Sequence, residues 1–431
     1  MTILNTVRGG PALSRRRLLG SMALGSAALA SAPLTGLRAQ AGTAAELEPI
    51  TGGAIPIGRA ERAERLKRAQ ALMADNDIGA ILIEPGASLV YFTGVRWWRS
   101  ERLTAAIIPA SGDPIIVTPF FERPSVAESL GIDADIRVWQ EDESPTRLVA
   151  QVLTERGLAD SRIGIEETVR FFASDGLAQA LPKAPLVSAA PVVRGCRMRK
   201  THAEIALMQT ANDVTLAAYR HVYPRIELGM TPAQIGAMMD DATRALGGRD
   251  PWSLILLGEA SAYPHGSGKP QRVERGGIVL MDCGCSVEDY QSDISRTFVF
   301  GADPTAEQAR VWNEVARGQQ VAFDAAQLGA PAGSVDDAVR AYYESLGYGP
   351  RYELPGLSHR TGHGIGMEGH EPVNLVHGEA TPLAPGMCFS NEPGLYAPGQ
   401  FGVRLEDCFH MTETGPQFFT TPPPSIDRPF G

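Results

Sequence analysis

The chain has 431 residues, enough for two or three domains, and its hydrophobic content of 44% and charged content of 20% are typical of a globular protein. Its formal net charge is −10, and no basic stripe with interleaved aromatic residues appears, which argues against a nucleic-acid partner.

Residues 1–41 have the pattern of an export signal rather than of a folded segment. Ser14–Leu19 contains a twin-arginine pattern, an apolar run follows to about Leu34, and Ala39–Ala41 offers a small-x-small cleavage site. The apolar run is too short and too rich in small residues for a stable membrane span. We therefore expect an exported, periplasmic protein that uses the twin-arginine route.

Residues 59–195 alternate between helical and strand-like stretches, which is typical of an α/β domain. Helices are predicted at 59–76, 143–156 and 171–181. Short apolar runs between turn signals are expected to be strands, at 78–83, 89–93, 104–108, 114–118, 136–139 and 162–165.

Residues 200–431 have helices in two groups with strands between and after them, an α+β arrangement that begins after a boundary near 193–200. Thr201 and Glu204 form a capping box at the start of a helix that runs to Val222. Further helices are expected after Thr231, from 303–305 to 323, and from 334 to about 347. Strands are expected at 278–281, 293–300, 388–391 and 403–410.

Four carboxylates, Asp282, Asp293, Glu392 and Glu406, lie in apolar, strand-like runs of this second part. An isolated Asp or Glu is usually a solvated surface charge. A carboxylate buried in such a run, however, costs several kcal/mol unless it pairs with a cation or binds a metal. Two adjacent antiparallel strands would bring Asp282 and Asp293 together, and a turn after Glu392 could do the same for Glu392 and Glu406.

Histidines accompany these carboxylates. His363 lies in a glycine-rich stretch that allows close approach of the backbone, with His359 and His370 nearby in the chain and His265 upstream of Asp282. Four carboxylates and one imidazole form an oxygen-rich ligand set that suits Mn, Co or Zn. The set has enough oxygens to bridge two such ions, which would turn a bound water into hydroxide near neutral pH.

From Arg59 to the C-terminus, these motifs resemble the pita-bread metallopeptidases, which include aminopeptidase P, prolidase and the metal-free creatinase. All five metal ligands of the family have a match, and Tyr91–Gly94 resembles the signature of its N-terminal domain. The resemblance implies a pita-bread catalytic domain at 200–431 preceded by a creatinase-type α/β domain at 59–195. It also implies an exported hydrolase of Xaa-Pro bonds that uses two divalent metal ions, with Mn favoured.

The resemblance also implies roles for individual residues. Asp282 binds one metal and His363 the other, Asp293 and Glu406 bridge them, and Glu392 binds metal and relays a proton from the bridging hydroxide that attacks the substrate. The catalytic histidines are expected to be His265, His359 and His370. Tyr396 and Arg404 are expected to orient the metal-bridging carboxylates.

Trp97, Trp98 and Arg99 follow the N-terminal signature in a loop. The resemblance implies that such a loop reaches the active site of a neighbouring subunit. The protein would then be a homodimer or homotetramer, and these three residues would line its substrate channel. A partly buried aromatic pair within the N-terminal domain is the alternative reading.

The sequence leaves several choices open. Ser295 replaces the usual Thr, Asn391 precedes Glu392, and His370–Asn374 differs from the prolidase pattern, so dipeptidase and aminopeptidase are not distinguished. The alternative function is that of a pita-bread relative acting on a small non-peptide substrate, as a creatinase-like hydrolase or a metal-dependent lyase. The five cysteines lack a zinc-binding spacing, and we expect them to be buried free thiols, with one disulfide as the alternative.

Overall fold

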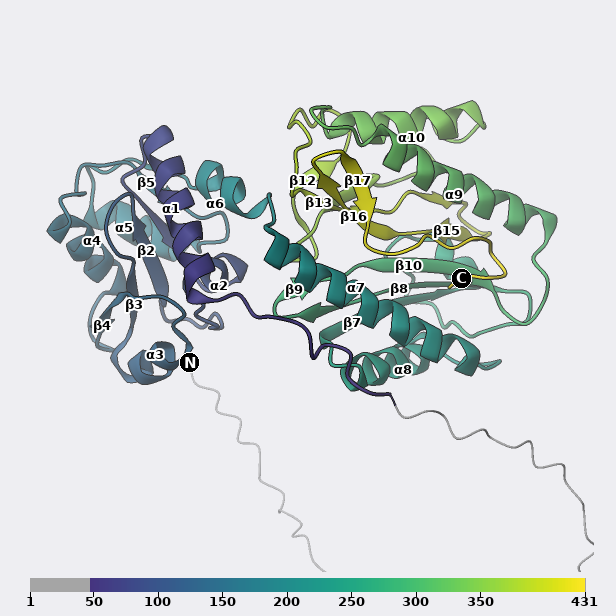
Figure 1. Cartoon of the computed structure of the whole chain (residues 1–431), viewed down its shortest axis with the longest axis horizontal. Coiled ribbons are helices and arrows are strands. Elements are labelled where there is room, and N and C mark those ends of the chain that lie inside the picture. The colour runs from purple at the N-terminus through teal and green to yellow at the C-terminus, as the bar shows by residue number, and fades with distance from the viewer. Residues whose placement is uncertain (1–46, 431) are drawn as a thin grey trace, which may run out of the picture. The chain divides into compact units, whose positions relative to one another are not determined.

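The computed structural model describes residues 47–430 (Figure 1). The predicted export signal in residues 1–41 lies outside this range. Within 47–430, none of the helices combines the length and apolar character that crossing a membrane requires.

The N-terminal part is built on one mixed sheet with the strand order β4-β3-β2-β1-β5-β6. Its strands are β1 (Ala80–Ile83), β2 (Ala105–Pro109), β3 (Ile115–Pro119), β4 (Asp135–Trp139), β5 (Ile163–Ile165) and β6 (Leu186–Ser188). β1 pairs antiparallel with β2 and parallel with β5. Five of the six predicted strands in this part are therefore confirmed.

Helices cover both faces of this sheet. Successive side chains of a strand point to opposite faces, and apolar side chains on both faces need helices to pack against. Ile81 and Ile83 of β1 belong to one apolar cluster, and Ala80 and Leu82 belong to the other. The first cluster includes residues of α1 (Arg59–Asp75), α2 (Ala87–Thr93), α3 (Arg123–Ser129) and α6 (Ala190–Arg197). The second includes residues of α4 (Pro145–Glu155) and α5 (Phe171–Ala180).

The prediction of a strand at 89–93 is wrong, because this run forms the end of α2. Its apolar residues are consecutive rather than alternating, so the run alone does not distinguish a buried strand from a short buried helix. Gly94 ends the helix in the left-handed conformation, with φ of 78°, which is typical of a helix C-terminus.

Four long helices of the C-terminal part confirm the predicted ones. They are α7 (His202–Val222), α8 (Pro232–Ala245), α9 (Ala306–Ala325) and α10 (Gly333–Ser345). Capping boxes at Thr201, Thr231 and Thr305 begin the first three helices. The side chain of each threonine accepts a hydrogen bond from the backbone N–H three residues further on, and the backbone N–H of the threonine donates to the side chain of that residue.

Two sheets carry the C-terminal part. The first has the order β10-β8-β7, with β9 (Tyr290–Gln291) also paired to β8, and contains β7 (Arg249–Leu257), β8 (Ile278–Val287) and β10 (Ile294–Val299). The second has the order β12-β11-β13-β16-β17 and contains β11 (Gly362–Gly364), β12 (Glu371–Leu375), β13 (Cys388–Asn391), β16 (Asp407–Thr412) and β17 (Gly415–Phe418). A separate pair joins β14 (Gly394–Tyr396) to β15 (Gly402–Arg404).

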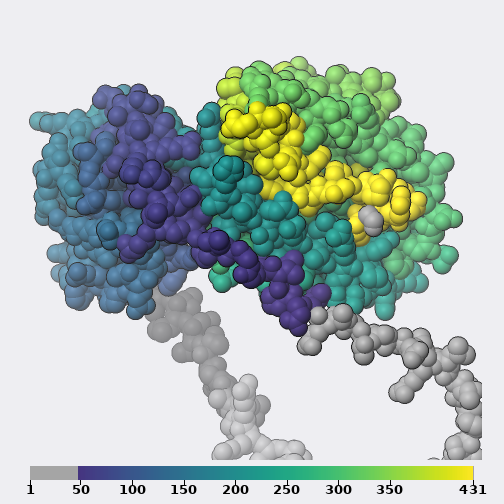
Figure 2. Space-filling view, in the orientation of Figure 1, coloured from purple at the N-terminus to yellow at the C-terminus, as the bar shows by residue number. Residues whose placement is uncertain are grey.

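The single strand predicted at 403–410 is interrupted. β15 ends at Arg404, and β16 begins at Asp407 in a different sheet, so Leu405 and Glu406 lie between two sheets. Beyond β17 the chain returns along α7, where Gln209 donates to the carbonyl oxygen of Phe419 and the Phe430 ring packs against Tyr219. In Figure 2 the yellow C-terminal segment lies against the teal part of the chain. The chain end thus packs on the helix that begins the C-terminal part.

All five cysteines are buried free thiols, as expected. Cys285 lies against Thr215, and Cys408 donates to the carbonyl oxygen of Asp293. Burial raises the pKa of each thiol, so these groups stay protonated and behave as small apolar side chains.

Candidate metal centre

A single cavity of about 740 Å³ contains all the predicted metal ligands. The ligands on its wall are Asp282, Asp293, His363, Glu392 and Glu406. They come from both sheets of the C-terminal part and from the segments that join the strands. The structure therefore brings together residues that span more than 120 positions of the sequence.

The first carboxylate pair follows from the antiparallel pairing of β8 and β10, as predicted. Asp282 on β8 lies opposite Ser295 of β10, and Cys283 lies opposite Ile294. Asp293 immediately precedes β10, so it lies near Asp282 across the strand pair.

The second pair comes from two neighbouring strand connections. Asn391 at the end of β13 lies opposite Asp407 at the start of β16. Glu392 and Glu406 are the residues next to this pair, where the chain leaves one sheet for the β14–β15 pair. The interruption between β15 and β16 is what places Glu406 inside the cavity.

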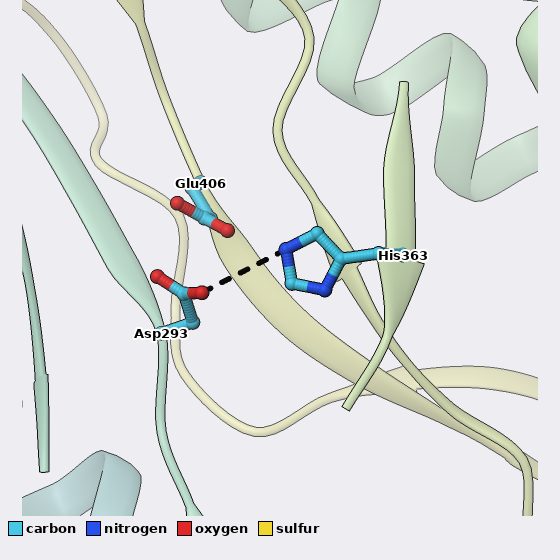
Figure 3. Close-up of side chains that lie close together, drawn as sticks. All are labelled: Asp293, His363 and Glu406. Carbon is cyan, nitrogen blue, oxygen red and sulfur yellow. Dashed lines mark ion pairs between the residues drawn. The ribbon is translucent and has the colours of Figure 1, made fainter. Parts of the chain in front are cut away.

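His363 completes the cluster from the middle of β11 (Figure 3). Its Nε2 lies 3.8 Å from Oδ2 of Asp293 and 3.5 Å from Oε1 of Glu392. Donor atoms of Asp293, His363 and Glu406 all lie within 4.8 Å of one another. Because Nδ1 lies 3.1 Å from the carbonyl oxygen of Gly364, Nε2 is the nitrogen available to a metal.

Burial and neighbouring acids raise the pKa values of Asp293, Glu392 and Glu406. Burial, reinforced by the charges of neighbouring acids, raises the pKa of Asp293 and of Glu392 well above the usual range. Burial and Asp282 raise the pKa of Glu406 to about 7 despite opposing hydrogen bonds from two serines. Burial and the nearby His370 lower the pKa of His363, which keeps its imidazole neutral.

The residues present fit a divalent cation. Oδ1 of Asp282 and Oδ1 of Asp293 are buried and have no hydrogen-bond partner among the described residues. Unpartnered buried oxygens are costly, and a coordinated cation would satisfy them. A cation would also neutralise the repulsion among the acids, and a neutral imidazole is the form of histidine that binds metal.

Arg404 and two serines fix the orientation of the carboxylates. Arg404 donates to Oδ2 of Asp282 at 2.6 Å and to Oγ of Ser295 at 3.0 Å. Ser295 in turn donates to Oε2 of Glu406 at 2.8 Å, and Ser390 donates to the other oxygen. Ser295, noted above as a departure from the family pattern, thus links an arginine to a predicted metal ligand.

The three predicted catalytic histidines also line the cavity. His370 packs edge-on against His363, with ring centroids 4.1 Å apart. Nε2 of His359 lies 2.8 Å from the hydroxyl of Tyr396, and burial together with Arg404 lowers the pKa of His359 to about 3. His265 follows the short helix η3 (Gly258–Ala262) on the cavity wall.

A buried ion-pair network that the sequence analysis missed supports His370. The next residue, Glu371, accepts from Lys200 at 3.0 Å and from Arg197. Burial alone would raise the pKa of Glu371, but Lys200 and Arg197 lower it to about 2. The pairs span more than 170 positions, so no local sequence signal could have shown them.

The cavity has further lining residues that were missed, including Trp252, Leu254, Pro264 and Arg360. Arg360 is three residues before His363, and its charge so close to a predicted ligand could have indicated that it lines the cavity. The other three belong to β7 and to the loop before His265, and they give the cavity an apolar wall.

Trp97, Trp98 and Arg99 do not line this cavity in the described part of a single chain. The two indoles are stacked with centroids 4.8 Å apart, and Trp98 is 68% exposed. Arg99 donates to the carbonyl oxygen of Pro85 at 2.9 Å, within the N-terminal part. A role in the substrate channel therefore requires a second copy of the chain and stays a prediction.

The clustered acids predict an unusual pH dependence for the metal-free protein. The pKa values of Asp293, Glu392 and Glu406 are raised in the folded state, so the folded chain binds more protons than the unfolded chain. Its stability should therefore fall as pH rises between about 4.5 and about 7, the folded-state pKa of Glu406. Metal binding displaces these protons, so the stabilisation by Mn²⁺ should grow over the same range.

Thermal unfolding followed by circular dichroism checks this expectation, with EDTA-treated and Mn²⁺-loaded protein measured in parallel from about pH 5 to about pH 8. A metal-free protein whose melting temperature rises across this range would contradict the assignment of raised carboxyl pKa values.

Comparison with known proteins places this geometry in a family. The Metallopeptidase family M24 matches residues 206–413, and the Creatinase/Prolidase N-terminal domain matches residues 65–199. The chain is 34% identical over 357 residues to "Probable dipeptidase PepE" of Mycobacterium tuberculosis, which covers 82% of this chain and 92% of the relative. It is 28% identical over 360 residues to "Xaa-Pro dipeptidase" of Pyrococcus furiosus, which covers 83% and 97%.

Solved structures agree with these matches. Dipeptidase PepE from Mycobacterium ulcerans superimposes with a TM-score of 0.78 at 34% identity, covering 86% of this chain and 98% of that one. The prolidase from Thermococcus sibiricus gives a TM-score of 0.76 at 25% identity, covering 84% and 97%. The pita-bread fold and the creatinase-type N-terminal domain expected from the sequence are thereby confirmed, and the chain belongs to metallopeptidase family M24.

Proposed function

We propose that this protein is a dipeptidase that hydrolyses the Xaa-Pro bond with two divalent metal ions. The observation that carries the proposal is the convergence of four carboxylates, two buried and two partly buried, and one neutral imidazole on a single cavity wall, in a chain of this family. The preference for dipeptides is supported by the relatives, which are named dipeptidases or Xaa-Pro dipeptidases.

Asp282, Asp293, His363, Glu392 and Glu406 are the residues that would hold the two ions. When bound, the two ions would act as Lewis acids that polarise the peptide carbonyl and acidify water. The four acids match the charge of two divalent cations, which is why the site tolerates so many carboxylates in one buried cluster.

The side chains around the cluster supply the remaining functions. Glu392 is placed to accept a proton from the attacking water and to pass it to the leaving proline nitrogen. His370 and His265 face the same cavity and can donate hydrogen bonds to the oxygen on which negative charge develops. The hydroxyl of Tyr396 lies 2.8 Å from Nε2 of His359 and accepts a hydrogen bond from Arg404 at 3.4 Å. Tyr396 therefore links the positions of these two side chains.

The cavity also has room and polarity for the substrate. Its volume of about 740 Å³ is in the ordinary range for small-molecule sites. Trp252, Leu254 and Pro264 provide an apolar wall against which a proline ring can pack.

The proposal is tested with the chain from residue 42 onward, loaded with Mn²⁺ and assayed on Ala-Pro, Ala-Pro-Ala and Ala-Leu. We expect Ala-Pro to be cleaved with the highest kcat/KM and the activity to disappear on chelation. Preference for Ala-Pro-Ala would instead indicate an aminopeptidase, and cleavage of none of the three peptides would reject the peptidase proposal.

A relative of the fold that acts on a small non-peptide substrate is the second candidate. The complete ligand set counts against a creatinase-like hydrolase, because creatinase works without metal. A metal-dependent lyase would keep the ligands, and it becomes the favoured reading if metal binds but no peptide is cleaved.

We also propose export by the twin-arginine route and assembly into a homodimer or homotetramer. Export is supported by the pattern in residues 1–41. Assembly is supported by the exposed Trp98, which stacks on the partly buried Trp97 and is a suitable contact for a second copy. Cell fractionation and sedimentation of the purified protein check the two proposals separately.

A further inference from the structure

Residues 357–361 belong to no helix or strand, yet they carry the predicted catalytic residue His359 and lead directly into β11 with its predicted ligand His363. Buried backbone groups need hydrogen-bond partners, and outside a strand ladder side chains often provide them. Here the carbonyl oxygens of Leu357 and His359 and the N–H of Thr361 bond to side chains of α10. Helix α10 therefore holds the backbone of a segment that contributes to the cavity wall.

Two charged residues of α10, Asp336 and Arg340, provide these bonds. They lie one helical turn apart, both are buried, and Nε of Arg340 donates to Oδ2 of Asp336 at 2.7 Å. The other nitrogens of the guanidinium donate to the carbonyl oxygens of Arg351 at 2.7 Å, Leu357 at 3.0 Å and His359 at 2.6 Å. The arginine therefore joins the segment before β11 to the helix at several points.

Asp336 continues this network toward two predicted metal ligands. Its Oδ1 accepts hydrogen bonds from the N–H and the hydroxyl of Thr361 at 3.1 and 2.7 Å. The carbonyl oxygen of Thr361 in turn accepts from the backbone N–H of Glu392 at 2.9 Å, and His363 follows Thr361 by two residues. Thr361 thus connects the aspartate to the backbone of both ligands.

Stability alone is a weak explanation for this ion pair. Two buried charges lose their hydration, so such a pair usually stabilises a fold little more than apolar residues of the same size. Here the charges of Asp336 and Arg340 hold backbone atoms of a segment that carries residues of the site. Contacts behind the ligands of a metal centre fix the orientation of those ligands, and losing one usually costs about 10- to 100-fold in metal affinity or activity.

We infer that Asp336 and Arg340, which are not among the residues of the cavity wall, are positioning residues of the metal centre. Arg340 sets the position of His359, and Asp336 sets the positions of Glu392 and His363 through Thr361. The inference rests on the proposed function, which gives these positions their importance for metal binding and hydrolysis.

The first test uses Asp336→Asn/Arg340→Met, which leaves no unpaired charge in the interior and keeps an oxygen that can accept from Thr361. Circular dichroism checks that the Mn²⁺-loaded variant is folded at the assay temperature. Loss of the donor to His359 should lower kcat for Ala-Pro by about 10- to 100-fold, while the calorimetric affinity for Mn²⁺ stays within about threefold of wild type. A pair that only stabilises the fold would lower the melting temperature and leave kcat of the folded enzyme unchanged, and that result would overturn the role assigned to Arg340.

The second test uses Asp336→Leu/Arg340→Met, which also removes the acceptor for Thr361. This variant should bind Mn²⁺ about 10-fold or more weakly than the first double variant. Thr361→Val, which removes only the hydroxyl donor and keeps the shape of the side chain, should weaken Mn²⁺ binding by about 3- to 10-fold and decides the point if the leucine variant does not fold. Wild-type affinity for Mn²⁺ in these variants would overturn the role assigned to Asp336.

The matched control is Asp240→Asn/Arg244→Met on α8, a less buried pair with the same order and spacing. Its kcat and its affinity for Mn²⁺ should stay within about threefold of wild type. Calorimetry needs no turnover, so it separates the inference from the proposed function. If wild type cleaves no peptide, the proposed function fails, but a difference in Mn²⁺ affinity between the two double variants of α10 still supports the inference, and equal affinities still overturn it.

Discussion

Replacement of Asp293 by asparagine is expected to lower kcat/KM for Ala-Pro by on the order of a thousandfold or more, because a metal ligand supplies several kcal/mol of transition-state stabilisation. Asp293 is 5% exposed, and its Oδ2 lies 3.8 Å from Nε2 of His363. Donor atoms of Asp293, His363 and Glu406 lie within 4.8 Å of one another. The amide keeps the size of the side chain but removes its charge. Metal content measured on the assayed sample should fall together with the activity.

The same substitution should have the opposite effect on the metal-free fold. Burial and three other acids raise the pKa of Asp293, so removal of its charge relieves repulsion near neutral pH. The EDTA-treated variant should therefore unfold at a higher temperature than EDTA-treated wild type. Asp303→Asn, an exposed change at the start of α9, is the matched control. Full activity of the Asp293 variant would remove this residue from the metal centre.

Replacement of Asp407 by alanine is expected to reduce the free energy of unfolding by about 3–5 kcal/mol, the usual cost of breaking a buried ion pair on one side. Asp407 accepts from Arg296 at 2.7 Å and from Gln319 at 3.1 Å, and Thr420 also donates to it. Arg296 and Asp407 are both fully buried. The substitution would leave the arginine charge without its carboxylate partner.

This loss should also reach the metal centre. Arg296 donates to the carbonyl oxygens of Ser295 and Glu406 at 3.0 and 2.8 Å, so it joins the segments that carry these two residues. Urea unfolding followed by circular dichroism measures the stability. Asp135→Ala breaks an exposed pair with Arg137 and should cost less than about 1 kcal/mol. Similar losses in the two variants would contradict the structural importance assigned to Asp407.

Local signals were sufficient for much of the fold. The capping box at Thr201, the helix start at Thr231 and the antiparallel arrangement of Asp282 and Asp293 could be predicted from neighbouring residues, because caps and tight strand connections are local. Strand β7 was not predicted, since it begins with the exposed Arg249 and Asp250, which are followed by Pro251. Strand β11 has only three residues, two of them glycine, so its pairing partners and not its own residues make it a strand.

The candidate site also combines residues that local motifs predict with contacts that depend on the tertiary structure. Its ligands were recognisable because each lies in a distinctive short motif that resembles a known family. The Lys200–Glu371 pair and the hydrogen bond between Arg360 and Asn374 arise from tertiary contacts. Asn374 could be noted only as a departure from the prolidase pattern, and its function as a holder of Arg360 appears only once β11 and β12 are paired.

A metal titration of the metal-free protein tests whether the chain is a two-metal dipeptidase. Mn²⁺ is added stepwise while Ala-Pro hydrolysis and bound metal are recorded on the same samples. We expect no hydrolysis without metal and a rise in activity that is complete at about two ions per chain, the number that four carboxylates neutralise. Tight binding of two ions without any cleavage of Ala-Pro would contradict this expectation.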